Sequence, residues 1–198
     1  AHARDLLRRI LARAPVVDAR FARQRRNRGG RVAGQQFQRH AIRPQPAAGL
    51  QRAGAGCVGF MDYALFERIV DKLARESPAA TPEVWLFNWG EPLLHPEAPR
   101  FLRLLRERGL PAHLSTNLNV RHGLDEVVAA APASLKVSIS GYSAATYADT
   151  HRRGDLELVV ANLRALRAAL DRHRVGTRIW VGQHVYRGNQ HEVEPLGA

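Results

Sequence analysis

Helix-type and strand-type hydrophobic patterns alternate from Phe60 to Tyr186, and this alternation limits the possible folds more than any other feature of the sequence. Apolar residues spaced three or four positions apart predict helices, whereas short apolar runs between turn residues predict buried strands. The expected helices span residues 62–76, 97–108, 124–130, 144–150 and 156–173, and the expected strands span residues 84–89, 112–116, 134–140 and 177–186. Helices between successive strands are typical of a parallel sheet with right-handed crossovers. We therefore predict an α/β fold.

Both an open doubly wound sheet and a segment of a (β/α) barrel fit this order of elements. In either architecture, ligand-binding residues gather where the strands end. Here the positions after the strands carry polar residues or glycine, in segments 88–92, 115–117, 138–141 and 184–186. We expect a functional site at this edge of the sheet.

Residues 1–56 differ in composition from the rest of the chain. They hold 13 Arg, no Lys and only the acids Asp5 and Asp18, whereas residues 57–198 hold 17 basic and 16 acidic side chains. Beyond a short basic helix pattern at the start, they show no period and too few aliphatic side chains to offset the entropy of ordering. We predict a disordered segment over 1–56, either a functional basic tail or the product of a reading-frame error.

Several classes of site lack their signatures. Cys57 is the one cysteine, which leaves no disulfide framework and no site that needs several cysteines from this chain. The histidines are spread without the spacing of a metal site, and we predict no metal ligands. No GxSxG elbow, Walker A loop or GxGxxG fingerprint occurs. The sequence has no apolar run long enough to span a bilayer, and its start has no apolar core of a signal peptide. We therefore expect a cytoplasmic protein with no membrane contact.

The first candidate site segment follows the strand expected at 84–89. Gly90 allows a ligand to approach the backbone, and Pro92 fixes the turn. Glu91 between them is suited to hold an ammonium group. The alternative is an ordinary strand-to-helix turn with a solvated glutamate.

Polar side chains at the next strand ends form the other candidate segments. Asn117 is suited to bind a ribose or a carboxylate, or to cap the following turn. Ser138 and Ser140 are two residues apart on a strand and so point to the same face. Arg152 and Arg153 are able to grip a carboxylate, or to lie in a solvated helix terminus.

Taken together, these segments resemble the core of a radical S-adenosylmethionine (radical SAM) enzyme. The resemblance covers roughly residues 59–190 and is carried by the order and spacing of the motifs, not by any single motif. The motifs are Gly59-Phe60-Met61-Asp62, then Trp89-Gly90-Glu91-Pro92-Leu93-Leu94-His95-Pro96, Leu114-Ser115-Thr116-Asn117, and Val137-Ser138-Ile139-Ser140-Gly141 with Tyr147 and Arg153-Gly154-Asp155. The chain is particularly similar to members that modify peptides or natural products and carry a C-terminal (SPASM-type) domain with auxiliary clusters.

The resemblance implies that residues 59–198 form a truncated partial (β/α) barrel. Its cofactors would be S-adenosylmethionine and a 4Fe-4S cluster that cleaves it reductively, and its partners a reductant protein and a small-molecule or peptide substrate. The family motifs put the cofactor's amino group at Gly90, Glu91 and Pro92, and its carboxylate at Ser138 with Arg152 or Arg153. Its ribose and the substrate would lie beside Asn117 and strand-end residues such as Gln183 or His184. Ser140 is a further cofactor-binding candidate. The resemblance assigns no catalytic residue.

One departure from the family pattern is decisive for activity. The family binds three irons through a C-x-x-x-C-x-x-C motif, but here Cys57 has no partner cysteine at either spacing. We therefore expect a chain that is inactive in radical chemistry. One alternative is a nucleic-acid-binding protein that acts through the basic segment, but a segment with Phe21 and Phe37 as its only aromatic residues is poorly suited to base stacking. Another is a scaffold without a ligand.

Overall fold

The structure is a computed structural model that describes residues 59–77, 82–88 and 90–192. Cys57, Trp89 and the disorder predicted for residues 1–56 lie outside the described residues, as do the last residues of the predicted domain 59–198. Within the described part, no helix combines the length and the apolar character needed to cross a membrane.

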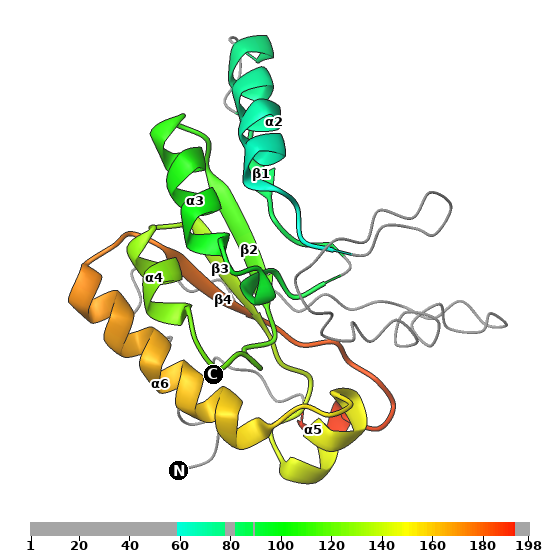
Figure 1. Ribbon diagram of the computed structural model, residues 1–198. Helices are drawn as coiled ribbons and strands as arrows, with labels where there is room; N and C mark the ends of the chain where they lie inside the picture. Colours follow the sequence, from blue (N-terminus) through cyan, green and yellow to red (C-terminus); the bar gives the residue numbers. More distant parts are fainter. Residues whose placement is uncertain (1–58, 78–81, 89, 193–198) are drawn as a thin grey trace, which may run out of the picture.

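The described strands form one parallel sheet, as the alternating pattern predicted (Figure 1). The sheet order is β1-β2-β3-β4, so that each strand pairs with its neighbour in the sequence. The strands are β1 (Val84–Trp85), β2 (Ala112–Thr116), β3 (Ser134–Ser138) and β4 (Arg178–Gly182). The α/β expectation is confirmed. In the described residues the sheet is open at β1 and β4.

Helices connect the strands and end close to the predicted positions. They are α2 (Tyr63–Glu76), α3 (Ala98–Glu107), α4 (Leu124–Ala129), α5 (Ala144–Thr150) and α6 (Leu156–His173), with short 3-10 helices η3 (Pro92–Leu94) and η4 (Gln190–Glu192). Side-chain caps set the starts of three of them, because Asp62, Ser143 and Asp155 accept hydrogen bonds from backbone amides three residues later. Gly109, with φ of 69°, follows the end of α3, where a left-handed residue favours glycine.

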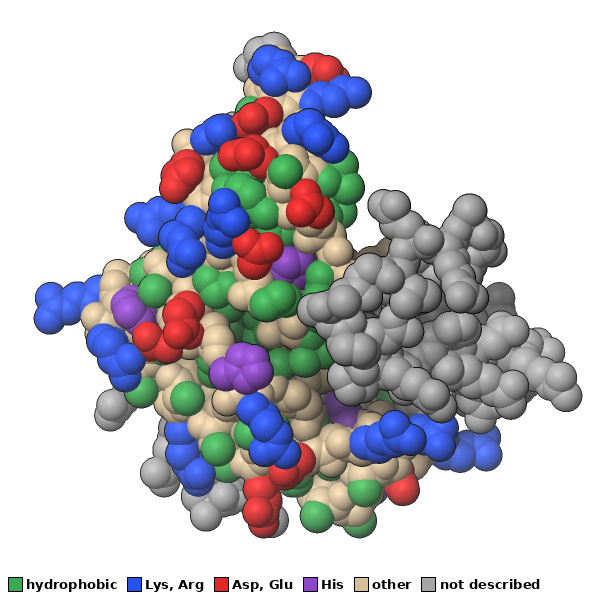
Figure 2. Space-filling model, in the orientation of Figure 1, with side chains coloured by type: hydrophobic (Ala, Val, Ile, Leu, Met, Phe, Trp, Pro, Cys, Tyr) green, Lys and Arg blue, Asp and Glu red, His purple; other side chains and the backbone are tan. Residues whose placement is uncertain are grey.

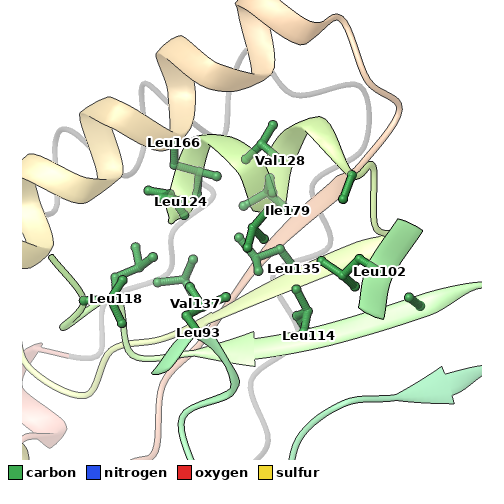
Figure 3. Close-up of a cluster of buried hydrophobic side chains, with 14 of the residues drawn as sticks. Leu93, Leu102, Leu114, Leu118, Leu124, Val128, Leu135, Val137, Leu166 and Ile179 are labelled. Carbon is green, nitrogen blue, oxygen red and sulfur yellow. The ribbon is translucent and has the colours of Figure 1, made fainter. Parts of the chain in front are cut away.

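The hydrophobic core lies between the sheet and the helices α3, α4 and α6 (Figures 1 and 3). Every second strand residue points into it. The strands contribute Leu114, Leu135, Val137, Ile179 and Val181, and the helices contribute Leu102, Leu105, Val128, Leu163 and Leu166, all of them buried. Burial of each such side chain stabilises the fold by about 1.5 to 3 kcal/mol relative to leaving it exposed.

The intervening strand residues define the opposite face of the sheet, which we call the polar face. Its members are Trp85, His113, Ser115, Ser134, Lys136, Ser138, Arg178, Trp180 and Gly182. The strand register places Lys136 between Ser115 and Trp180, and pairs Ser138 with Gly182. Alternation along each strand thus separates an aliphatic face from a face rich in hydroxyl, cationic and aromatic groups.

The outer strands are shorter than predicted. The chain leaves β1 after Trp85 instead of continuing to residue 89, although the Leu86 amide still donates to the His113 carbonyl at 2.9 Å. The strand β4 ends at Gly182 instead of Tyr186, because the Asn189 side chain binds the backbone of His184 and Tyr186. At both β1 and β4, the sequence pattern that predicted the strand extends further along the chain than the pairing of the strand in the sheet.

Candidate ligand-binding site

Glu91 connects the turn at η3, in the segment after β1, to the loop that follows β2. Its Oε1 accepts a hydrogen bond from the Leu93 amide at 3.1 Å, and its Oε2 accepts one from the Asn117 amide at 2.8 Å. Glu91 caps η3 in the segment after β1, and Asn117 follows β2, so the carboxylate joins this turn to the loop after β2. The sequence left open that Glu91 is a solvated glutamate in an ordinary turn. In the structure, Glu91 is half-buried and hydrogen-bonded.

Burial raises the pKa of the Glu91 carboxyl above its ordinary value. The hydrogen bonds from the Asn117 amide, the Leu93 amide and the Thr116 hydroxyl act in the opposite direction without cancelling this effect. The two carboxylate oxygens together have about four lone-pair directions, so these three donors leave capacity for a further donor. An ammonium group is a donor of matching charge.

Gly90 and Pro92 shape the backbone on either side of this carboxylate. Gly90 is exposed, and a Cβ built on it would meet no atom within 4 Å. The protein's own packing therefore does not require glycine here, and the open backbone is accessible to a ligand. Pro92 begins the 3-10 helix η3 directly after Glu91, and Leu93 of this helix is buried in the core.

The loop after β2 is attached to the helices that follow. The Asn117 side chain accepts a hydrogen bond from the Asn119 amide at 2.8 Å, the geometry of a turn-forming asparagine. Asn119 in turn donates through Nδ2 to the Tyr147 hydroxyl at 2.5 Å and accepts from the Asp155 amide at 2.8 Å. The amide group of Asn117 therefore has a structural partner, and the Asn119 contacts, which sequence reasoning missed, hold its loop against α5 and α6.

Ser138 and Ser140 have different partners, and β3 ends at Ser138. The Ser138 hydroxyl lies 3.2 Å from the Ser115 hydroxyl on β2. The Ser140 hydroxyl is buried and accepts a hydrogen bond from the His184 amide at 3.2 Å. Asn189 donates to the carbonyls of both Ser140 and His184, at 2.7 Å each. Ser138 is thus half-buried at the sheet edge, whereas Ser140 links β3 to the segment after β4.

Arg152 and Arg153 are exposed in the turn between α5 and α6, and no ion pair involves them in the part of the chain that the structure describes. The residue of this turn that reaches the sheet is His151. Its ring stacks on Tyr147 with centroids 4.3 Å apart and forms a hydrogen bond with the Ser138 backbone. Sequence reasoning missed this role, although the spacing of four residues from Tyr147 on a helix was a usable signal.

Two histidines near the sheet edge, His151 after α5 and His184 after β4, have lowered pKa values. Burial lowers the pKa of His151, the Ser138 backbone partly opposes this, and His184 lowers it further. His184 is exposed on one side, but desolvation by the atoms packed around it lowers its pKa, and so does the charge of Lys136. A neutral imidazole both donates and accepts a hydrogen bond, which suits contact with ribose hydroxyls.

Lys136 and Gln183 are the remaining polar groups with chemistry at this site. Lys136 Nζ lies 5.0 Å from the centroid of the Trp180 ring on the polar face. Gln183 is buried and accepts from the Tyr142 hydroxyl at 3.4 Å, while its Nε2 has no hydrogen-bond partner. An unpartnered buried donor is costly to the protein alone and becomes satisfied when a ligand supplies an acceptor.

The site residues fit the two implied cofactor groups unequally. The donor and acceptor groups of Glu91, Ser138, His184 and Gln183 Nε2 are of the kinds that an adenosyl amino acid needs. A 4Fe-4S cluster does not fit, because it needs thiolates and the sequence has Cys57 alone. Within residues 59–77, 82–88 and 90–192, no group of three or more His, Cys, Asp or Glu side chains is arranged to hold a metal ion.

Comparison of the sequence with family models finds no matching family, and comparison with curated proteins finds no match. The interpretation of the site therefore depends on its own geometry and on the motif resemblance.

Proposed function

We propose that this chain is a radical SAM-type core that binds an adenosyl amino acid, S-adenosylmethionine or its product S-adenosylhomocysteine, at the carboxyl ends of its strands. The observation that carries the proposal is the Glu91 carboxylate, which lies half-buried between η3 and the loop after β2 with capacity for another donor. It belongs to the Trp89–Pro96 motif, and the other motifs of the resemblance follow in order on the next strands.

The parallel sheet supports the architecture implied by the resemblance. Four successive parallel strands with helices on one face have the connectivity of part of a (β/α) barrel. We infer that the polar face corresponds to the interior of such a barrel. A complete strand set would then enclose the ligand between this face and the strands opposite.

In this proposal each residue has a binding role. Glu91 receives the ligand's ammonium group, and the exposed Gly90 backbone allows its approach. The Ser138 hydroxyl lies on the carboxylate side, with Arg152 or Arg153 as the family-implied cation. His184, Ser140 and Asn117 lie on the ribose side, and Gln183 Nε2 supplies a donor.

The proposal ends at binding. Radical SAM enzymes cleave the cofactor with an electron from a 4Fe-4S cluster, and this chain lacks the thiolates to hold one. We therefore propose no reductive cleavage, and neither the reductant protein nor the peptide or small-molecule substrate enters a step by this chain.

Isothermal titration calorimetry with S-adenosylhomocysteine tests the role of Glu91. We expect weak binding by the wild type, and a loss of about 1 to 3 kcal/mol, about 5-fold to 100-fold in Kd, in Glu91→Gln because a charge-assisted hydrogen bond is lost. The matched control is Glu76→Gln, whose side chain is exposed on α2 and pairs with Lys72. Equal affinity of wild type and Glu91→Gln would remove Glu91 from the site, and no binding by the wild type would refute the proposed function.

The alternative of nucleic-acid binding depends on the Arg-rich residues 1–56, which lie outside the described residues. On the described part, basic and acidic side chains are interspersed in the view of Figure 2. A salt titration of RNA binding separates the two functions, because binding through phosphate contacts weakens steeply as the salt concentration rises.

A further inference from the structure

Lys136 occupies the centre of the polar face. In the strand register it lies between Ser115 on β2 and Trp180 on β4. Its Nζ is 3.2 Å from the position that a Cβ of Gly182 would take. Gly182 is two residues beyond Trp180, so the lysine side chain extends along the sheet toward the carboxyl ends of the strands. The ammonium group thus lies level with Ser138, which pairs with Gly182.

The surroundings of this ammonium group lack a compensating charge. None of the four strands contains Asp or Glu, and no described carboxylate forms an ion pair with Lys136. One acid lies beside this face: the exposed Glu83 carboxylate is 3.8 Å from His113 Nε2 near the start of β2, whereas the Lys136 chain extends toward the carboxyl ends of the strands. Burial lowers the pKa of His113, with Glu83 acting against this effect, and desolvation lowers the pKa of His184, so the fold favours the neutral form of both rings. Arg178 is exposed. The polar face therefore favours an anion.

We propose that Lys136 binds a carboxylate group of a ligand that lies on the polar face, beside the hydroxyls of Ser115 and Ser138. An ammonium–carboxylate hydrogen bond at a partly buried site is short and strong, and hydroxyl donors nearby complete the coordination of the oxygens. The half-buried Trp180 ring stabilises the ammonium from its other side. Lys136 is better placed for this contact than Arg152 and Arg153, which are exposed in a turn.

Two sources have the required chemistry. The carboxylate is either that of the adenosyl amino acid or that of a second molecule, a substrate, on the same face. The geometry of the polar face is sufficient to argue that Lys136 binds a carboxylate. The further step, that this carboxylate belongs to the adenosyl ligand, rests on the proposed function.

The first experiment observes the lysines directly by NMR of isotopically labelled dimethyl-lysine. The sequence contains only the lysines Lys72 and Lys136. Lys72, whose side chain is 67% exposed on α2, is the internal control. The variants Lys72→Met and Lys136→Met assign the two signals and separate them from that of the N-terminal amine.

Acetate is titrated in place of chloride at constant ionic strength. We expect a saturable shift of the Lys136 signal and no such shift of the Lys72 signal. A Lys136 signal that responds to acetate no differently from that of Lys72 would overturn the proposal. Gly182→Ala gives a further check, because the new Cβ would displace the lysine chain without changing its charge, and we expect the acetate response to be lost.

The second experiment distinguishes the sources by calorimetry with S-adenosylhomocysteine and 5′-methylthioadenosine, which has no carboxylate. If the carboxylate belongs to the adenosyl ligand, Lys136→Met weakens binding of the first by about 10-fold or more and leaves the second unchanged. An acetate response with unchanged S-adenosylhomocysteine affinity in Lys136→Met assigns the carboxylate to a substrate. An acetate response without any nucleoside binding supports the Lys136 site and refutes the proposed function. Nucleoside binding without an acetate response supports the proposed function and refutes the Lys136 site.

Discussion

Glu91 and Glu192 both accept hydrogen bonds from backbone amides, yet their pKa values move in opposite directions. Burial raises the pKa of Glu91, and its hydrogen bonds do not offset this effect. Burial also raises the pKa of Glu192, but hydrogen bonds from Ser143, Tyr142 and Thr146 outweigh it and leave the pKa below its ordinary value. Relative to the unfolded chain, folding therefore makes Glu91 easier to protonate and Glu192 harder to protonate.

The stability of variants at these positions should depend on pH with opposite signs. Because the pKa of Glu91 is raised in the folded state, the native state binds more protons than the unfolded state around this pKa. The contribution of Glu91 to the free energy of unfolding of the wild type is therefore lost as pH rises through the folded-state pKa. The wild type gains the Glu192 contribution as pH rises through the lowered folded pKa toward the ordinary value of 4.5. Relative to wild type, Glu91→Gln should therefore become more favourable and Glu192→Gln less favourable with rising pH.

Urea unfolding at a series of pH values between about 3 and 7, which brackets the ordinary carboxyl pKa, measures these differences. Glu76→Gln, at an exposed position on α2, is the control. Parallel pH profiles for the Glu91 and Glu192 variants would contradict the opposite electrostatic surroundings of the two carboxyls.

Not all site residues were equally predictable from the sequence. Glu91 and Ser138 follow directly from their position after strands, because a polar residue there breaks the apolar pattern. Lys136 gave no such signal. The alternation of apolar and polar residues shows that a strand has two faces, but it does not show which side chains of the neighbouring strands lie beside a given residue. His151 also depends on the turn between α5 and α6, which brings its ring to the Ser138 backbone.

At the scale of elements, helices were predictable because each carries its own end signals. Asp62, Ser143 and Asp155 cap their helices through contacts within three residues of sequence. The strand ends depend instead on distant partners. Asn189 takes up backbone groups of the segment after β4, a contact that no local pattern encodes. Local signals thus define the helices, and tertiary contacts define where the sheet stops.

The junction between β3 and α5 requires a glycine at position 141. A Cβ there would lie 2.6 Å from the Tyr147 amide nitrogen and 2.8 Å from the Thr146 carbonyl carbon, both backbone atoms that move only with the helix. We expect Gly141→Ala to lower the free energy of unfolding by about 1 to 3 kcal/mol, the range for overpacking. Thermal and urea unfolding measure this change.

Gly188→Ala provides the matched control, because a Cβ at that position would meet no atom within 4 Å. We expect its effect to stay within about 0.5 kcal/mol, as for ordinary surface substitutions. If both variants unfolded at the same urea concentration, the close approach of α5 to the end of β3 would not exist in solution.

At the scale of the whole molecule, the sequence holds one cysteine, Cys57, whereas the 4Fe-4S cluster of the radical SAM enzymes that it resembles needs three thiolates. We expect that anaerobic reconstitution with iron and sulfide yields no stable 4Fe-4S absorption, and that a reductant with S-adenosylmethionine yields no 5′-deoxyadenosine. Absorption spectroscopy and chromatography of the products test this. Cys57→Ala should behave like the wild type, and reductant-dependent 5′-deoxyadenosine in the wild type above background would refute the expectation.

The strand order β1-β2-β3-β4 also has a consequence for how the chain folds during synthesis. Among the described strands, β2, β3 and β4 each pair with the strand made just before it, so none of these has to insert between two others. This order keeps the sequence separation between partners as small as the connecting helices allow, and smaller separations favour faster folding. As translation proceeds at about 5 to 20 residues per second, each new strand and its helix can dock on the edge already present, and the sheet grows in the direction of synthesis.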